Sequence, residues 1–213
     1  MSVLLAVLLA LALLALAAVL VVLVVVLRRS RAGATHRSQH AGPRDPFSPA
    51  NETAGDPRTL KAGDMVDYLG QRLFLRGSLR LREGGYTWSE HFLDEGGEGA
   101  KRWISVEEDP ALEVVLWTAL GDDSLLPNES TIVMGDVTYR RVEHGTATYT
   151  CEGTTGLPDR GRVEYVDYEA DHETATRGTG ARYLSFERFD GAGWEAGLGE
   201  VIPNGTLTIY PGS

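Results

Sequence analysis

Three patterns of apolar and polar residues follow one another along this chain. In the first, every residue from Val3 to Leu27 is Ala, Val or Leu. As a helix this run would be about 37 Å long at ~1.5 Å per residue, which exceeds the ~30 Å hydrocarbon core of a bilayer. A cleaved signal peptide would have a basic start and a shorter apolar core. The pattern therefore predicts a retained, single-pass transmembrane helix over residues 1–27.

The second pattern, residues 28–58, is rich in Arg, Ser, His and Pro and has no apolar period. Such a segment cannot bury enough apolar surface to become ordered, so we expect a disordered basic linker. Arg28, Arg29 and Arg31 directly follow the helix, and only the α-amino group precedes it. Basic residues stay on the cytoplasmic side of a membrane. The N-terminus is therefore expected outside the cell membrane and the remaining chain in the cytoplasm.

The third pattern, residues 59–211, consists of short runs in which apolar and polar residues alternate, separated by Gly, Asp and Pro. Alternation with a period of two is typical of strands, and no window shows helical periodicity. The expected strands are Met65–Leu69, Arg72–Leu81, Tyr86–Leu93, Lys101–Glu107, Leu112–Ala119, Asp136–His144, Thr146–Glu152, Arg162–Glu169, Arg182–Phe189 and Thr206–Tyr210. Evenly spaced short strands predict an all-β sandwich or barrel.

An internal echo suggests that this all-β part is duplicated. Tyr86–Asp109 and Tyr165–Asp190 both open with Tyr, place a Glu four residues later, pass a Gly-containing turn and end in a basic-aromatic-aliphatic-Ser-apolar-Glu row. The pair Gly63-Asp64 is likewise echoed by Gly135-Asp136. Repeated units of this kind predict two β-meander halves, repeat one at about 59–130 and repeat two at about 131–211.

Alternation also assigns faces to the repeated rows. Ile104 and Val106 point to one side of their strand, and Leu184 and Phe186 repeat that side. We expect these four side chains in one shared core. The other side combines aromatic residues with carboxylates, and it supplies our candidate binding residues: Tyr86, Trp88, Glu90, Trp103, Glu107, Tyr165, Glu169, Tyr183 and Glu187.

Two interpretations of this aromatic–carboxylate face stay open. In the first, it forms a groove that binds a cationic or amphipathic ligand through cation–π and carboxylate contacts. In the second, the Glu side chains pair with arginines of neighbouring strands and the aromatic rings cap the core. The arginines available for such pairs are Arg80, Arg82, Arg102 and Arg182.

Charge and candidate chemistry narrow the choice of partner. The chain has a formal net charge of −10, so nucleic acid is not expected to bind it. The sequence contains no P-loop, HExxH, CxxC or GxSxG motif, and we expect no metal and no cofactor. His91, His144 and His172 are isolated from one another. Cys151 is the one cysteine, which excludes an intrachain disulfide and favours a small buried residue over a nucleophile.

Several of these residues also carry a resemblance to a known family. The segments Leu60–Asp64, Tyr86-x-Trp88-x-Glu90, Trp103-Ile104 and Tyr183–Glu187 resemble the bacterial family called domain of unknown function 4178 over roughly residues 59–202. The resemblance implies an actinobacterial origin and, loosely, genomic company with membrane-stress and polyamine-related proteins. It implies no catalytic residues.

Two functional classes follow from the sequence. The first is a membrane-tethered, non-enzymatic binding or adaptor domain whose partner is a basic protein segment or a polyamine, because an acidic aromatic face attracts cations. The alternative is an enzyme that uses dispersed carboxylates or Cys151.

Overall fold

The computed structural model describes residues 55–94, 99–122, 124–171 and 182–212, and every structural statement below concerns these ranges. The predicted transmembrane helix and the predicted linker up to residue 54 lie outside them. Within the described ranges no helix has the length and apolar character needed to cross a membrane.

Strands are the main regular structure of the described chain, as its alternation predicts. One short 3₁₀ helix, η2, precedes eleven strands, and every strand pair is antiparallel. Their bounds are η2 (Pro57–Thr59), β1 (Met65–Tyr68), β2 (Gln71–Glu83), β3 (Tyr86–Asp94), β4 (Arg102–Glu108), β5 (Leu112–Ala119), β6 (Thr131–Met134), β7 (Val137–Gly153), β8 (Arg160–Ala170), β9 (Tyr183–Phe189), β10 (Glu195–Val201) and β11 (Thr208–Tyr210).

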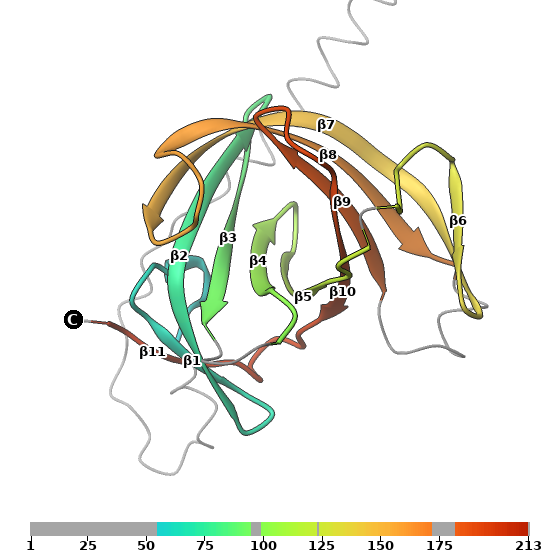
Figure 1. Ribbon diagram of the computed structural model, residues 1–213. Coiled ribbons are helices and arrows are strands. Elements are labelled where there is room, and N and C mark those ends of the chain that lie inside the picture. The colour runs from blue at the N-terminus through green and yellow to red at the C-terminus, as the bar shows by residue number, and fades with distance from the viewer. Residues whose placement is uncertain (1–54, 95–98, 123, 172–181, 213) are drawn as a thin grey trace, which may run out of the picture. The chain divides into compact units, whose positions relative to one another are not determined.

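Eight of these strands close into a barrel, which decides between the sandwich and the barrel left open by the sequence. The sheet order is β11-β1-β2-β3-β4-β5-β10-β9-β8-β7-β6, and β2 also pairs with β7. Closure is possible because β2 and β7 are long, with 13 and 17 residues. One part of each pairs with β1 or β6, and the other part joins the two strands to each other. Figure 1 shows β1 and β11 at one side of this ring and β6 at the other.

The two halves of the chain follow the same strand order. The run β2–β5 and the run β7–β10 each consist of consecutive hairpins, and they meet at the β2–β7 and β5–β10 seams. A duplication of the unit stays a prediction. Within it, the two Gly-Asp pairs do not occupy corresponding places, because Gly63-Asp64 precedes β1 whereas Gly135-Asp136 joins β6 to β7.

Glycine caused the main errors in the expected strands. The segments expected at Asp136–His144 and Thr146–Glu152 are one strand, β7, with a bulge near Arg141 and Glu143. Position 145 lies inside that strand and is a glycine, because a Cβ there would lie 2.5 Å from a Glu83 carboxylate oxygen. The Gly-containing β10 and the short β6 were not expected at all.

The predicted shared core of Ile104, Val106, Leu184 and Phe186 is wrong, although all four side chains are buried. Ile104 and Val106 pack in a cluster on β2–β5 that β1, β11 and the segment before β1 complete. Leu184 and Phe186 pack in a second cluster with side chains of β6, β7 and β8. Both pairs point out of the closed ring from strands separated by β5 and β10, so they diverge.

Candidate functional site

The inward faces of the barrel strands line a cavity of about 530 Å³. Cross-strand pairs share a face of the sheet, and the register carries one face around the ring through Glu90↔Ser105, Ser105↔Val115 and Tyr165↔Glu187. The lining residues are Glu83, Gly84, Tyr86, Trp88, Glu90, Trp103, Ser105, Glu107, Asp109, Glu113, Val115, Trp117, Val142, Glu143, His144, Tyr165, Asp167, Tyr183, Ser185 and Glu187.

Eight of the nine candidate binding residues belong to this lining. The exception is Glu169, whose carboxylate accepts two hydrogen bonds from Arg182, at 2.8 and 3.1 Å. The structure therefore brings the aromatic–carboxylate faces of both similar sequence rows to one cavity. Among the described residues, Arg80 pairs with Glu152 and Arg182 with Glu169, and no arginine forms an ion pair with Glu90, Glu107 or Glu187.

One wall of the cavity is a row of aromatic rings. Trp103 stacks on Trp117 with 5.9 Å between ring centroids and 9° between planes, and Trp117 lies 6.3 Å from Tyr183. The glycines of β10 make room for this row, because a Cβ on Gly197 would lie 2.5 Å from the Trp103 indole and one on Gly199 would lie 2.8 Å from Trp117. This row of rings therefore requires glycine at positions 197 and 199.

Trp117 and Glu113 are functional candidates that sequence reasoning missed. Both lie on β5, outside the repeated rows, and they face the cavity because they alternate with outward residues. Trp117 donates from Nε1 to Ser105 Oγ at 2.9 Å. Glu113 accepts from the Tyr183 hydroxyl, which lies 3.0 Å from both carboxylate oxygens. Period-two alternation along Leu112–Ala119 was the signal that could have found them.

The opposite wall joins an aromatic pair to a carboxylate. Trp88 and Tyr165 meet edge to face with centroids 5.8 Å apart. The Tyr165 hydroxyl donates to Glu83 Oε2 at 2.6 Å, and burial followed by this bond raises the pKa of Tyr165 well above its usual value. Tyr165 therefore acts as a neutral donor that fixes the Glu83 carboxylate.

The lining contains eight carboxyl groups and no lysine or arginine. The deepest is Glu90, which is 3% exposed and accepts one hydrogen bond from Trp88 Nε1 at 3.3 Å. Its other oxygen, Oε2, has no donor among the described side chains. The carboxyl group of Glu187 from β9 lies beside that of Glu90. Two ionised carboxylates are both acceptors, so the contact becomes a hydrogen bond only when the pair holds a proton.

The electrostatics of the cavity favour any added positive charge. Burial, and then the charge of Glu90, raise the pKa of Glu187 well above its usual value. Burial, opposed by a hydrogen bond from Ser185 and assisted by the charge of nearby Glu143, raises the pKa of Asp167 to about 7. Burial likewise raises the pKa of Glu107. A cavity of this kind holds protons at neutral pH or exchanges them for another cation.

These shifts predict that protonated carboxyl groups in the cavity contribute stability that is lost as the pH rises from about 4 to 7. A carboxyl group with a raised pKa stabilises the fold when protonated, and that contribution disappears as the pH passes its folded-state value. For Asp167 this value is about 7. We expect this contribution to be on the order of 2 kcal/mol, measured in thermal melts as the difference in Tm between the wild type and Asp167→Asn. That difference should shrink as the pH rises from about 4 to 7, and a difference that does not change with pH would contradict the assignment.

His91 acts in the opposite direction at lower pH. It is fully buried between Ser78 Oγ, 2.8 Å from Nδ1, and Ser89 Oγ, 3.0 Å from Nε2. Burial, and then the charge of Arg80, lower its pKa to about 3. The unfolded chain therefore takes up a proton at about pH 6.5 that the folded chain refuses, and stability falls below that pH. Between about pH 4 and 6.5 the two effects oppose each other, so the Tm should change less with pH than either group alone would cause.

The other chemical candidates are engaged structurally. The half-buried Cys151 thiol donates to the Pro158 carbonyl at 3.0 Å and accepts from Thr155 Oγ1 at 3.3 Å. Across the part of the chain that the structure describes, no group of three or more His, Cys, Asp or Glu side chains is arranged to hold a metal ion.

Comparison with known proteins gives the chain relatives without a described activity. The family model described as "Domain of unknown function (DUF4178)" matches residues 61–204. Uncharacterized proteins of Mycobacterium bovis and Mycobacterium tuberculosis are 40% identical over 190 residues, which covers 87% of this chain and 86% of theirs. These relatives agree with an actinobacterial origin. No solved structure matches the chain.

Proposed function

The chain belongs to the family of domain of unknown function 4178, and we propose that its barrel binds a small organic cation in the cavity and releases it unchanged. The observation that carries this proposal is the lining itself. It surrounds about 530 Å³ with aromatic rings and eight carboxyl groups, and it supplies no lysine or arginine to neutralise them. Cation–π and carboxylate contacts together are the means by which proteins hold alkylammonium ligands.

The buried end of the cavity has the chemistry of an ammonium site. Glu90 Oε2 needs a donor, and Glu187 lies against it. A primary ammonium group offers three donors and one positive charge, so it satisfies both carboxylates where a single proton satisfies them only in part. The Trp103–Trp117–Tyr183 row then provides an apolar surface for the attached hydrocarbon chain.

The dimensions favour a thin ligand over a folded partner. The cavity volume is within the range of small-molecule sites. Tyr86 and Val142 are exposed members of its lining, and they mark an opening beside the β2–β3 hairpin. A linear polyamine fits this description along its whole length. A basic protein segment would fill the same cavity only with one inserted Lys or Arg side chain.

The proposed setting of this binding domain is the cytoplasmic side of a membrane. It rests on the apolar run Val3–Leu27 and on the arginines that follow it. External protease added to intact spheroplasts is expected to leave the barrel whole. Digestion of the barrel under those conditions would contradict the orientation.

Calorimetric titration of the full chain with spermidine, in a non-ionic detergent, tests the proposed ligand class. We expect one spermidine per chain, and binding that weakens as salt rises because added ions screen the attraction of the carboxylates. Triethylene glycol, a neutral chain of similar length, serves as the matched ligand and should give no heat. Absence of spermidine binding, or equal binding of both compounds, would refute the proposal.

The Glu90–Glu187 pair also supports a second candidate function. Two carboxyl groups that share a proton form an acid/base pair of the kind used in hydrolytic enzymes. Mass spectrometry of the spermidine recovered after incubation with the protein separates the two functions. An unchanged ligand agrees with binding alone, whereas a new product would show an enzyme.

A further inference from the structure

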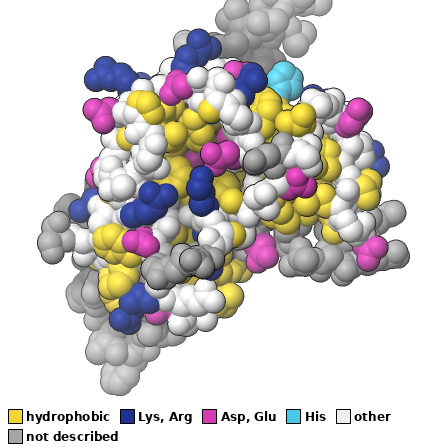
Figure 2. Space-filling view, viewed as in Figure 1, with side chains coloured by type: hydrophobic (Ala, Val, Ile, Leu, Met, Phe, Trp, Pro, Cys, Tyr) yellow, Lys and Arg dark blue, Asp and Glu magenta, His cyan; other side chains and the backbone are white. Residues whose placement is uncertain are grey.

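A basic trough lies on the outer side of the same barrel strands. Although the chain is acidic overall, basic side chains occur on its surface among acidic and apolar ones (Figure 2). Five arginines and only two glutamates line a concavity of about 870 Å³, which we call the arginine trough. Its charged lining residues are Arg58, Arg80, Arg82, Arg160, Arg162, Glu107 and Glu108.

Strand register arranges four of these arginines in two parallel rows. In the first row, Thr148 of β7 is paired with Arg82 on one side and Arg162 on the other. In the second row, Thr150 is paired with Arg80 and Arg160 in the same way. Next-nearest strands lie about 10 Å apart and alternate residues about 7 Å apart along a strand. The four arginines therefore project from one small, nearly rectangular patch.

Hydroxyl groups complete the two rows on β3. Ser89 is paired with Arg80, and Thr87 with Arg82. Each row thus runs hydroxyl, guanidinium, hydroxyl, guanidinium across four strands. The opposite face of these strands is apolar, since Leu81 and Tyr149 pack with Trp88 in the barrel interior. The trough and the cation cavity are therefore on opposite sides of the sheet.

Three of the arginines have no carboxylate of their own. Arg82, Arg160 and Arg162 are exposed, and within the described ranges none of their side chains forms an ion pair. In an acidic chain, carboxylates for such pairs are abundant elsewhere. Grouping unpaired guanidinium groups around a concave surface places like charges together, and an oxyanion relieves that repulsion through charge-assisted, forked hydrogen bonds.

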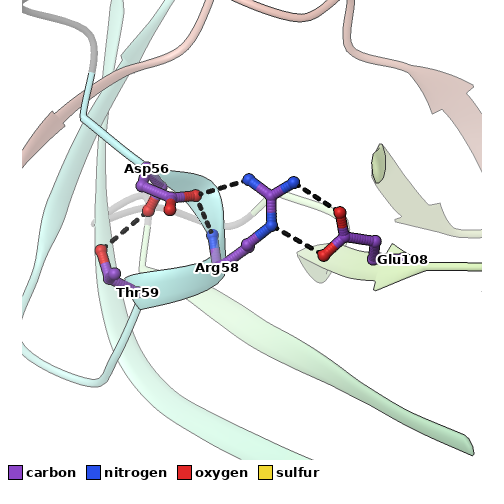
Figure 3. Close-up of polar contacts among 4 residues, drawn as sticks. All are labelled: Asp56, Arg58, Thr59 and Glu108. Carbon is purple, nitrogen blue, oxygen red and sulfur yellow. Dashed lines mark hydrogen bonds and ion pairs between the residues drawn. The ribbon is translucent and has the colours of Figure 1, made fainter. Parts of the chain in front are cut away.

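One of the two glutamates in the trough lining, Glu108, is already neutralised by an arginine. Arg58 holds Glu108 with two hydrogen bonds, Nε to Oε2 at 2.8 Å and Nη2 to Oε1 at 2.7 Å, and its Nη1 reaches Asp56 at 3.1 Å (Figure 3). The other glutamate, Glu107, belongs to the inward face of β4 and lines the cation cavity. Neither group competes with a ligand for Arg82, Arg160 or Arg162.

We propose that the arginine trough binds a soluble ligand that carries two or more adjacent phosphate groups. Arg82 and Arg162 in one row and Arg160 in the other, about 7 Å away along the strand, offer forked donors to neighbouring phosphates at once. Arg80 is held by the Leu60 carbonyl and by Glu152. The concave shape favours a compact oligophosphate over a flat membrane surface, which would contact only the rim. Anionic lipid headgroups share the phosphate chemistry, and the experiment distinguishes them.

The test titrates the full chain in non-ionic detergent with inorganic pyrophosphate. We expect binding that weakens with salt. In the double variant Arg82→Gln/Arg162→Gln we expect at least about a hundredfold rise in Kd, from the usual strength of two lost charged hydrogen bonds. The matched control, Arg72→Gln/Arg141→Gln, removes the same charge from β2 and β7 outside the trough. It should leave the Kd within about twofold.

Several results would overturn the proposal. These are absence of pyrophosphate binding, an equal loss in the trough variant and its control, or a response to phosphatidylglycerol in the micelles without a response to pyrophosphate. Far-ultraviolet circular dichroism of each variant checks that the barrel is intact. If the trough variant were unfolded, Arg160→Gln alone, which removes one exposed side chain, would provide the same comparison with Arg141→Gln.

Discussion

The double substitution Glu90→Gln/Glu187→Gln is expected to weaken spermidine binding at least about 100-fold, because each carboxylate makes a charged hydrogen bond to the ammonium group worth roughly 1.5–3 kcal/mol. The same change should raise the free energy of unfolding at pH 8 by about 1–3 kcal/mol, since two amides can hydrogen-bond to each other where two buried carboxylates repel. Calorimetry and thermal melts of the variant measure the two effects.

Glu169→Gln is the matched control for this prediction. Glu169 occupies the same strand face as Tyr165 and Asp167, yet it lies outside the cavity lining and pairs with Arg182. Its replacement should leave spermidine affinity within about twofold and cost no more than about 1 kcal/mol, as for an exposed ion pair. If the double variant instead melted at lower temperature with unchanged affinity, the glutamates would be structural and the binding proposal would fail.

Phe186→Ala is expected to lower the free energy of unfolding by about 3–5 kcal/mol, which makes it the most damaging single substitution we consider. Phe186 is completely buried in the cluster beneath β6, and its ring meets Tyr168 edge to face at 5.7 Å. Removing the ring leaves a cavity that the rigid barrel wall cannot fill. Urea denaturation followed by tryptophan fluorescence measures the change.

Phe74→Ala tests whether this loss comes from burial. Phe74 also lies in a barrel strand, β2, but it is 46% exposed. The same substitution there should cost less than about 1 kcal/mol. Equal losses at the two positions would mean that the outer clusters do not hold the barrel together as described.

The sequence predicts the faces of the strands better than their closure. Alternation places Trp103 and Glu107 on one side and Ile104 and Val106 on the other, and the structure agrees, because side-chain direction in a strand is a local property. Whether those faces turn inward or outward depends on the β2–β7 pairing. The paired residues of β2 and β7 are about 70 positions apart in the sequence, and no local pattern encodes their contact.

The errors in the predicted core and strands also come from contacts between parts of the chain that are distant in sequence. An aliphatic face is normally assigned to a common core, but in this barrel Ile104 and Leu184 point outward and are covered by different edge strands. Gly145, Gly197 and Gly199 look like turn residues in the sequence. They lie within strands, and they are glycines because side chains from other strands occupy the space that a Cβ would need. Only the assembled barrel shows this contact.

The central claim, that a cation enters the barrel, is tested most directly by the indole N–H resonances of the full chain during a spermidine titration. The protein has four tryptophans. Trp88, Trp103 and Trp117 line the cavity, whereas Trp194 lies outside it beneath the Arg188 guanidinium, 4.7 Å from the ring centroid. The account predicts that spermidine shifts the first three resonances together and leaves that of Trp194 in place. Three unmoved cavity resonances, or a shift confined to Trp194, would contradict it.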